Sequence, residues 1–326
     1  LVPLGVGEAR SVGVPTAHSA LRGVALLRRE HVVNGHLSLR RLLLKLRIEG
    51  VTAGRLTKED VVAFAKESCG ICESAKMQRR GFTLATPPLD PTPPPIGKLW
   101  VADELTLDVP CADMGYTKIY VAVDRATSKH FAIGMIGETA AAIKQAEDEL
   151  RNFVRPQHGD IWVIRKDSLP AHRSREHASD LAVAGQQRQL SPPGVHEGVH
   201  QAENAILHGT PAANALLMQT DDLGNNHFYV AFRCALAAQD FGPSGDHDPP
   251  SSANMRYYGH TDWMKSGLYV FGSPCKAFIH ADFRGAGKQG DKGLRAYPCV
   301  YTGPALNSNS LAHCSVWCGR YVDVDI

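Results

Sequence analysis

The chain has 326 residues, of which 44% are hydrophobic and 21% charged, and its formal net charge is +2 at pH 7. A chain of this length can bury a sizeable core, and the length favours two or three modules over one. No apolar run approaches the roughly eighteen residues that cross a bilayer, and no secretory signal is apparent. We therefore expect a soluble, intracellular protein with no membrane partner.

The near-neutral charge neither requires nor excludes a nucleic-acid partner, so local clusters of residues must decide. Eight cysteines are too few to build a disulfide scaffold. The sequence begins at Leu1 without an initiator Met, which suggests a fragment of a longer polyprotein. Residues 1–30 show no clear periodicity, and we assign them to the remnant of an upstream segment.

Two helices are predicted after this segment. From Leu39, leucines recur with the spacing i, i+3, i+4, i+7, which predicts an amphipathic helix that ends at Gly50. Thr57 is followed three residues later by Asp60, and this capping box predicts the start of a second, short helix.

Four candidate metal ligands flank these helices, His31 and His36 before them and Cys69 and Cys72 after them. Zinc binds four such ligands tetrahedrally, and the two residues between the cysteines let both thiolates reach one ion. Four protein ligands leave no open position, so we expect a structural Zn²⁺ site that holds residues 31–80 together. The alternative is that these residues are buried thiols and solvated histidines.

A basic segment and a proline-rich linker follow. A cluster of positive charge follows the metal module in the sequence and is formed by Lys76, Arg79 and Arg80. It predicts contacts with nucleic acid. Residues 81–98 contain a proline run that cannot form a helix or a central strand. We place a domain boundary there.

Residues 99–220 are predicted to form an α/β domain. We expect strands at residues 99–103, 118–124 and 130–136, a helix at 139–154 and a strand at 161–167. This β-β-β-α-β order is the start of a ribonuclease-H-like fold with a mixed five-stranded sheet and helices.

The rest of the chain is predicted to be less regular. Residues 221–255 are expected to form an irregular segment and a linker, because Gly and Pro cluster near its end. Residues 256–326 are expected to form a small β-rich module with strands at 268–271, 299–302 and 314–324. A role for Cys314 and Cys318 in an interaction protein has little support, because such a lone pair is more typical of core thiols.

Three acidic residues are candidates for a second metal site. Asp103 and Asp167 end predicted strands, and 35 residues separate Asp167 from Glu203. Two-metal phosphoryl transfer requires carboxylates from distant positions, because each Mg²⁺ needs several oxygen ligands. We expect Asp103 to bridge both ions, with Asp167 and Glu203 each holding one. Asp108 competes with Asp103, since it also follows a strand-like stretch.

From His31 to its end, the chain resembles the integrase region of copia-type LTR-retrotransposon Gag-Pol polyproteins. The motifs that carry the resemblance are Glu30-His31 with Gly35-His36-Leu37-Ser38, Cys69-Gly70-Ile71-Cys72 with Lys76 and Arg79, Ile119-Tyr120-Val121-Ala122-Val123-Asp124-Arg125-Ala126-Thr127, His196-Glu197-Gly198-Val199-His200-Gln201-Ala202-Glu203, Leu268-Tyr269-Val270-Phe271-Gly272 and Cys299-Val300-Tyr301-Thr302-Gly303. The fourth motif is similar to the family's third-acid helix, which matches Glu203 to that acid.

The resemblance implies an integrase that cleaves the ends of element DNA and joins them to target DNA. It also implies structural zinc, catalytic Mg²⁺ or Mn²⁺, a homo-multimeric complex, and no small-molecule substrate. By the same resemblance, we expect a virus-like particle in the cytoplasm first and then the nucleus.

Several positions depart from the family pattern. Asp167 lacks the family's following Gly-rich turn, Val199-His200 replaces Asn-Gly, and Asn204 replaces Arg. Pro211 falls inside the predicted helix, where a proline costs about 3 kcal/mol. These departures favour a second interpretation, in which the chain is a catalytically dead, nucleic-acid-binding remnant of a decayed copy.

Overall fold

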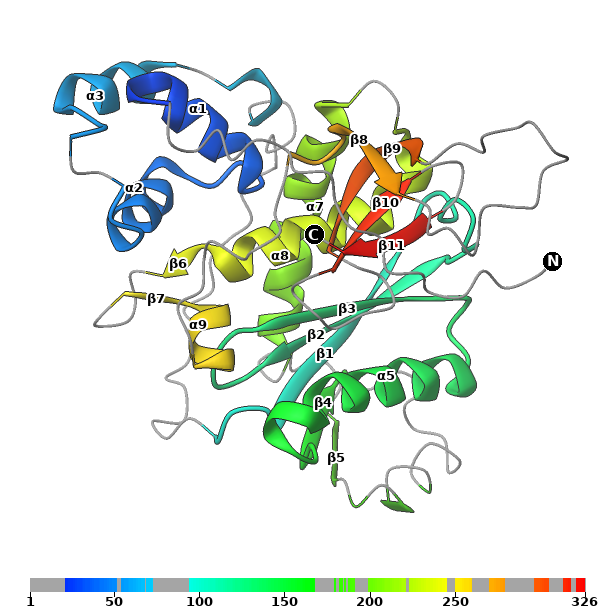
Figure 1. Cartoon of the computed structure of the whole chain (residues 1–326). Helices are drawn as coiled ribbons and strands as arrows, with labels where there is room; N and C mark the ends of the chain where they lie inside the picture. Colours follow the sequence, from blue (N-terminus) through cyan, green and yellow to red (C-terminus); the bar gives the residue numbers. More distant parts are fainter. Residues whose placement is uncertain are drawn as a thin grey trace, which may run out of the picture.

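The computed structural model has an α/β core with a helical cluster on one side and a small antiparallel sheet (Figure 1). The structure describes residues 21–51, 54–67, 69–72, 94–167, 179, 182–183, 185, 187–190, 199–220, 223–244, 250–259, 270–278, 296–304, 313–317 and 321–325. No helix within these ranges is long and apolar enough to cross a membrane.

The core is built on a mixed sheet in the order β3-β2-β1-β4-β5. Its strands are β1 (Leu99–Thr106), β2 (Lys118–Asp124), β3 (His130–Met135), β4 (Val163–Lys166) and β5 (Gln187–Leu190). Strands β1, β2 and β3 pair antiparallel, whereas β4 runs parallel to β1 and β5 parallel to β4. The mixed α/β architecture expected from the sequence is confirmed.

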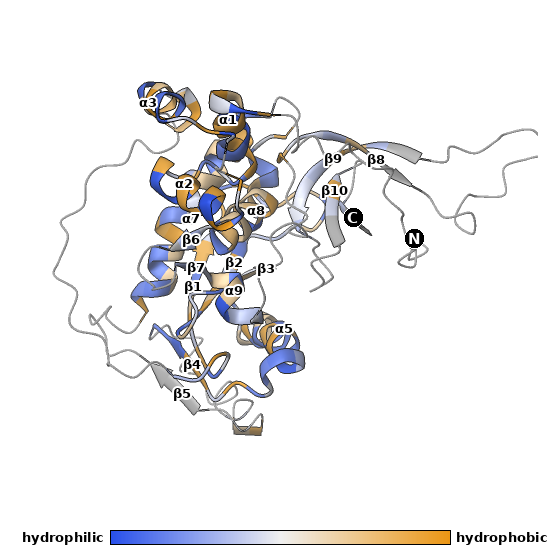
Figure 2. Ribbon diagram, turned by 60° about the vertical axis from the view of Figure 1, so that its left-hand side comes forward, coloured by the Kyte–Doolittle hydropathy of each residue, from blue (hydrophilic) through white to orange (hydrophobic). Residues whose placement is uncertain are grey.

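The sheet separates two hydrophobic cores. Successive side chains of a strand point to opposite faces, so Val101 and Val121 face one core while Trp100 and Tyr120 face the other. Helix α5 (Ala140–His158) covers the Trp100 side, and α7 (His200–Met218) and α8 (Phe228–Phe241) cover the Val101 side (Figure 1). Helix α5 carries both hydrophobic and hydrophilic residues, as expected for a helix with one buried face (Figure 2).

Helix α8 corrects the expectation that residues 221–255 are irregular. It begins after a short 3-10 turn at Asn225–His227, and ten of its fourteen residues are buried. A helix that is buried nearly all round has no polar face, so its sequence lacks the apolar and polar alternation that reveals surface helices. The expected linker at 242–252 also contains paired strands β6 (Pro243–Ser244) and β7 (Ser251–Ser252), and α9 (Ala253–Tyr258) follows.

The N-terminal cluster contains α1 (Gly23–Val33), α2 (Leu39–Ile48) and α3 (Lys58–Lys66), which share a small core formed by Leu27, Leu42 and Leu46. The capping box of Thr57 and Asp60 is present at the start of α3. Helix α1 corrects the boundary between an upstream remnant at residues 1–30 and the metal module, because that boundary falls inside the helix. Its hydrophobic residues pack within the cluster, while basic residues interrupt their periodicity in the sequence.

The C-terminal sheet has the antiparallel order β11-β10-β9-β8. Its strands are β8 (Pro274–Phe278), β9 (Ala296–Pro304), β10 (His313–Trp317) and β11 (Tyr321–Asp325). Two strand predictions need correction. The described part of 268–271 leads into a turn, and 314–324 contains two strands because the chain reverses between β10 and β11.

A buried ion-pair cluster joins α8 to the start of β3. Asp240 is 1% exposed, and its carboxylate accepts hydrogen bonds from Lys129 Nζ at 2.6 Å, His130 Nδ1 at 2.6 Å and the His130 main-chain N–H at 3.2 Å. The positive charges of Lys129 and His130, with their hydrogen bonds, outweigh the effect of burial and hold the pKa of Asp240 below its usual value.

We predict that Asp240→Ala lowers the free energy of unfolding by about 3–5 kcal/mol, because it leaves the buried Lys129 ammonium uncompensated. Urea unfolding followed by circular dichroism measures this change. Asp160→Ala is the matched control, since it removes the exposed ion pair between Asp160 and Arg155 at the end of α5 and should cost about 1 kcal/mol or less. Equal losses in the two variants would contradict the prediction.

Candidate metal centres

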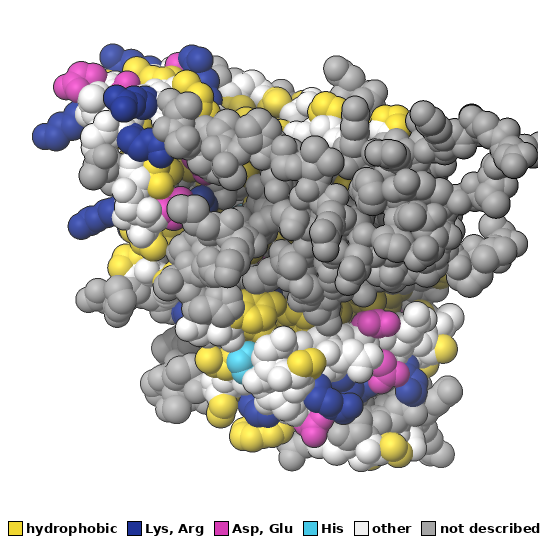
Figure 3. Space-filling view, in the orientation of Figure 1, with side chains coloured by type: hydrophobic (Ala, Val, Ile, Leu, Met, Phe, Trp, Pro, Cys, Tyr) yellow, Lys and Arg dark blue, Asp and Glu magenta, His cyan; other side chains and the backbone are white. Residues whose placement is uncertain are grey.

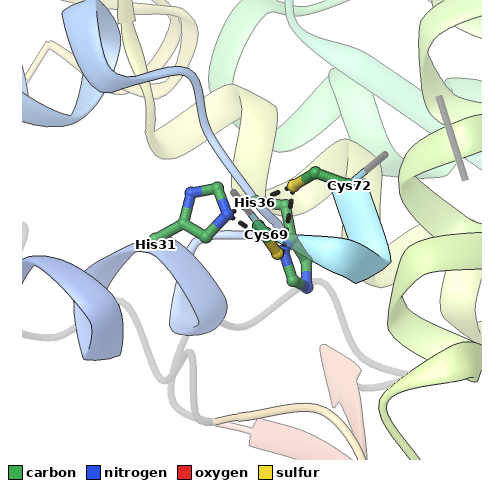
Figure 4. A group of neighbouring side chains, drawn as sticks. All are labelled: His31, His36, Cys69 and Cys72. Carbon is green, nitrogen blue, oxygen red and sulfur yellow. Dashed lines mark hydrogen bonds between the residues drawn. The ribbon is translucent and has the colours of Figure 1, made fainter. Parts of the chain in front are cut away.

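The first centre is the group of His31, His36, Cys69 and Cys72, whose four ligand atoms lie within 4.8 Å of one another. His31 lies in the last turn of α1, His36 follows that helix, and the two cysteines come from the short segment after α3 (Figure 4). The sequence-predicted quartet is therefore brought together from parts of the chain more than thirty residues apart.

The spacing of these atoms suits a tetrahedral ion. His31 Nε2 lies 3.2 Å from Cys72 Sγ and 3.1 Å from His36 Nδ1, and His36 Nδ1 lies 3.3 Å from Cys72 Sγ and 3.6 Å from Cys69 Sγ. Usual zinc–nitrogen and zinc–sulfur bond lengths place tetrahedral ligands about 3.3–3.8 Å apart. The four side chains thus already have approximately the arrangement that zinc requires.

Each imidazole also has an oxygen partner on its outer side. His31 Nδ1 lies 2.9 Å from the Leu37 carbonyl oxygen, and His36 Nε2 lies 3.1 Å from Oε1 of Gln219. An N–H that donates outward leaves the inner nitrogen free to bind an ion, which is the usual pattern for histidine ligands. The donor set and its surroundings therefore fit a bound zinc ion.

The backbone around His36 is unusual. His36 has a φ of 59° and follows Gly35 with a φ of 62°, so two consecutive residues lie in the left-handed region. This conformation is uncommon for a residue with a side chain and occurs most often at functional sites. Here it turns the buried imidazole of His36 toward the other three ligands.

The second candidate centre is formed by Asp103, Asp167 and Glu203. In the parallel pairing of β1 with β4, Ala102 lies opposite Lys166, so the next residues, Asp103 and Asp167, follow side by side. Asp103 does not end its strand as expected, because β1 continues to Thr106 through its pairing with β2. Glu203 lies in the first turn of α7, which packs against β1 and β2. The fold therefore brings the three sequence-predicted acids to one region.

The electrostatics of Asp103 reflect this arrangement. The pKa of Asp103 is raised to about 6, chiefly by burial and further by the negative charges of Glu104, Glu203 and Asp167, against one hydrogen bond from the Glu104 main-chain N–H. Asp103 thus interacts electrostatically with both other members of the trio. The competing candidate Asp108 is exposed in a bend beyond the end of β1.

The position of Asp167 is fixed by the residue before it. Lys166 is 1% exposed and forms an ion pair with Glu147 of α5, which is also 1% exposed. Arg151 lies 3.4 Å from the same Glu147 carboxylate. Strand β4 is therefore bound to α5 immediately before the second acid, a contact that the sequence analysis did not single out.

The two centres differ in compactness. Among the described residues, the His/Cys quartet is the group of metal-ligating side chains whose atoms converge on one point, and the acid trio does not converge as closely. The basic residues Lys76, Arg79 and Arg80 lie outside the described residues, as does the segment after Asp167. The sequence did not indicate Glu104, whose charge raises the pKa of Asp103, or Gln219, which contacts His36, because neither belongs to a spaced motif.

The solved structures similar to this chain include two integrase catalytic core domains. The catalytic core domain of BIV integrase shares 16% sequence identity, with 49% of this chain and 93% of that domain covered, at a TM-score of 0.38. The HTLV-2 integrase catalytic core domain in complex with magnesium, in its dimeric form, shares 14% identity, with 51% and 97% covered, at a TM-score of 0.38. No protein-family model and no curated protein matches the sequence.

We predict that Asp103→Asn raises the thermal unfolding midpoint at pH 7.5 and changes it little at pH 4. The folded-state pKa of about 6 lies above the usual value of 3.8, so ionisation of Asp103 destabilises the fold as pH rises through this window. Differential scanning calorimetry at both pH values tests this sign.

The control is Asp108→Asn, which removes an exposed carboxylate just beyond the end of β1. This variant should leave the midpoint nearly unchanged at both pH values. A lower midpoint for Asp103→Asn at pH 7.5 would show that the ionised carboxylate does not destabilise the fold.

Proposed function

We propose that this chain is a DNA integrase of the copia-type LTR-retrotransposon class, which inserts element DNA ends into target DNA. The observation that carries the proposal is the placement of Asp103, Asp167 and Glu203 by two parallel strands and a helix. Carboxylates that meet from distant chain positions are the arrangement that two-metal phosphoryl transfer requires.

Within this proposal, the His/Cys quartet holds a structural zinc ion. Four protein ligands saturate the ion, so its role is to stabilise α1–α3 rather than to activate a substrate. The small core of this cluster contains three fully buried leucines, which is little for an independent module. Metal binding would supply much of its folding free energy.

The acid trio would hold Mg²⁺ or Mn²⁺. When bound, such ions activate the attacking oxygen and neutralise charge at the phosphate. The chain's own contribution is to position the carboxylates: β1 places Asp103, the Lys166 ion pair fixes β4 before Asp167, and α7 presents Glu203. Because an ion competes with the proton on Asp103, binding should weaken as pH falls below about 6.

The partner proposed for this chain is DNA, and the helical cluster offers a surface for it. Figure 3 shows Lys and Arg side chains gathered over α1–α3. The exposed basic residues of this cluster are Arg22, Arg28, Arg40, Arg47, Lys58 and Lys66. Positive side chains bind phosphates with little dependence on base sequence, as target DNA of varied sequence requires. By resemblance, we further propose a homo-multimer that acts in the nucleus.

One observation favours the second candidate function, a DNA-binding remnant without catalysis. Helix α7 contains no Lys or Arg, and the position after Glu203 is an exposed Asn204 where the family has Arg. Each missing phosphate contact weakens DNA binding and reduces its salt dependence. Pro211, by contrast, does not interrupt α7: it is buried within the helix, which continues past it to Met218.

We predict that Glu203→Gln abolishes Mn²⁺-dependent strand transfer and disintegration on oligonucleotides, because it removes one anionic metal ligand. The control is Glu149→Gln, which changes an exposed glutamate of α5 and should retain activity. Activity that persists in Glu203→Gln would reject the assigned site. A folded, zinc-loaded wild type that binds DNA without catalysis would favour the remnant.

We predict that the purified chain contains one zinc ion, and that Cys72→Ala loses it and exposes α1–α3 to limited proteolysis. The matched control is Cys111→Ala, a buried thiol of the core that belongs to no ligand group. Atomic absorption gives the stoichiometry. Equal zinc content in wild type and Cys72→Ala would contradict the assignment of this ligand.

A further inference from the structure

We propose that Gln219 is a positioning residue of the His/Cys centre, through which metal binding holds three parts of the chain together. These parts are the helical cluster α1–α3, the end of helix α7, and the turn that leads into the C-terminal sheet. The inference rests on the proposed zinc centre but concerns a residue outside its ligand set.

Gln219 uses both ends of its side-chain amide. It follows the last residue of α7, and its Oε1 lies 3.1 Å from His36 Nε2. Its Nε2 donates a hydrogen bond to the Phe271 carbonyl oxygen at 3.0 Å. His36 and Phe271 are 1% and 2% exposed and Gln219 is half-buried, so both hydrogen bonds are partly shielded from water, where polar groups that lose a partner are costly.

The direction of these hydrogen bonds depends on the metal. An ion bound at His36 Nδ1 leaves the ring proton on Nε2, which must then donate to an acceptor. The amide oxygen of Gln219 is that acceptor, and this orientation points the amide nitrogen at Phe271. Metal binding therefore fixes one consistent chain of hydrogen bonds, in which His36 Nε2–H donates to Gln219 Oε1 and Gln219 Nε2–H donates to the Phe271 carbonyl oxygen.

Other contacts place the helical cluster against the same region of the core. The Arg41 guanidinium lies 3.3–3.4 Å from the carbonyl oxygens of Gln239, Gly242 and Pro243, at the end of α8. Gly35 packs on the same helix, since a Cβ there would lie 3.1 Å from Cβ of Ala238. The contact between His36 and Gln219 is thus part of an interface, and it is the part that reaches the metal ligands.

Helix α7 gives this interface a functional consequence. The helix carries Glu203 in its first turn and ends immediately before Gln219. The helix is continuous and packs against α8 and the sheet, so fixing its end restricts the position of its start. Because metal binding and docking stabilise each other, the loaded centre favours the docked position of the helix that carries the third acid.

The test measures zinc affinity in the full chain by competition with a chromogenic chelator. Gln219→Leu should weaken zinc binding about 10- to 100-fold with all four ligands intact. Gln219→Glu keeps an oxygen for His36 and should retain near-wild-type affinity. Gln239→Leu makes the same change at a neighbouring interface residue that contributes its main-chain carbonyl, and it should also retain affinity.

Hydrogen exchange tests separately the contact of the Gln219 amide oxygen with His36 and that of its amide nitrogen with Phe271. Adding Zn²⁺ to the metal-free wild type should slow exchange at residues 217–220 and 271–273. Gln219→Glu should bind zinc yet lose the added protection at 271–273, because a carboxylate cannot donate to Phe271. If Gln219→Leu fails to fold, this exchange pattern of Gln219→Glu decides the question.

The outcomes distinguish the two levels of the proposal. A wild type that binds no zinc, although folded by circular dichroism, would reject the zinc centre itself. Normal zinc binding by the wild type, with equal affinity in Gln219→Leu and Gln239→Leu, would reject the role of Gln219 and leave the zinc centre intact. Unchanged protection at 271–273 in Gln219→Glu would reject the link to Phe271.

Discussion

The parallel pairing of β1 with β4 is the constraint on which the site depends. The parallel register sets Ala102 opposite Lys166, so Asp103 and Asp167 are neighbours although 63 residues separate them. The pairing is held by α5, whose buried Glu147 binds Lys166. The opposite face is covered by α7, which adds Glu203. Loss of this single register would separate the acids while leaving each helix intact.

The two candidate centres have opposite effects on the stability of the fold. The His/Cys quartet presents inner nitrogens and sulfurs to one point and stabilises its cluster once an ion binds. The acid trio brings like charges together in a partly buried position, and the pKa of Asp103 is raised, chiefly by burial and less by its acidic neighbours. Such a site lowers stability in exchange for metal binding, which is common at functional sites. Gln219 connects the two centres through α7.

Features set by local sequence were largely predictable. Strand β2 has the expected limits, Thr57 caps α3 as its motif predicts, and the spacing of the four His/Cys ligands anticipated their meeting. Features set by tertiary packing were not. Helix α8 is buried on most sides and shows no polar face, so it was taken as irregular. Gln219 acts on a histidine 183 residues away, and nothing in its neighbourhood indicates this contact.

In the proposed integrase, Asp103, Asp167 and Glu203 bind divalent metal together. Iron-directed cleavage tests it most directly: Fe²⁺ with ascorbate and peroxide cuts the backbone beside the bound ion, and mass spectrometry locates the cuts. A shared site should give cleavage near all three acids, suppressed by excess Mg²⁺ and unaffected by zinc at the His/Cys centre. Cleavage near only one of the acids, or cuts that Mg²⁺ does not suppress, would contradict a shared site.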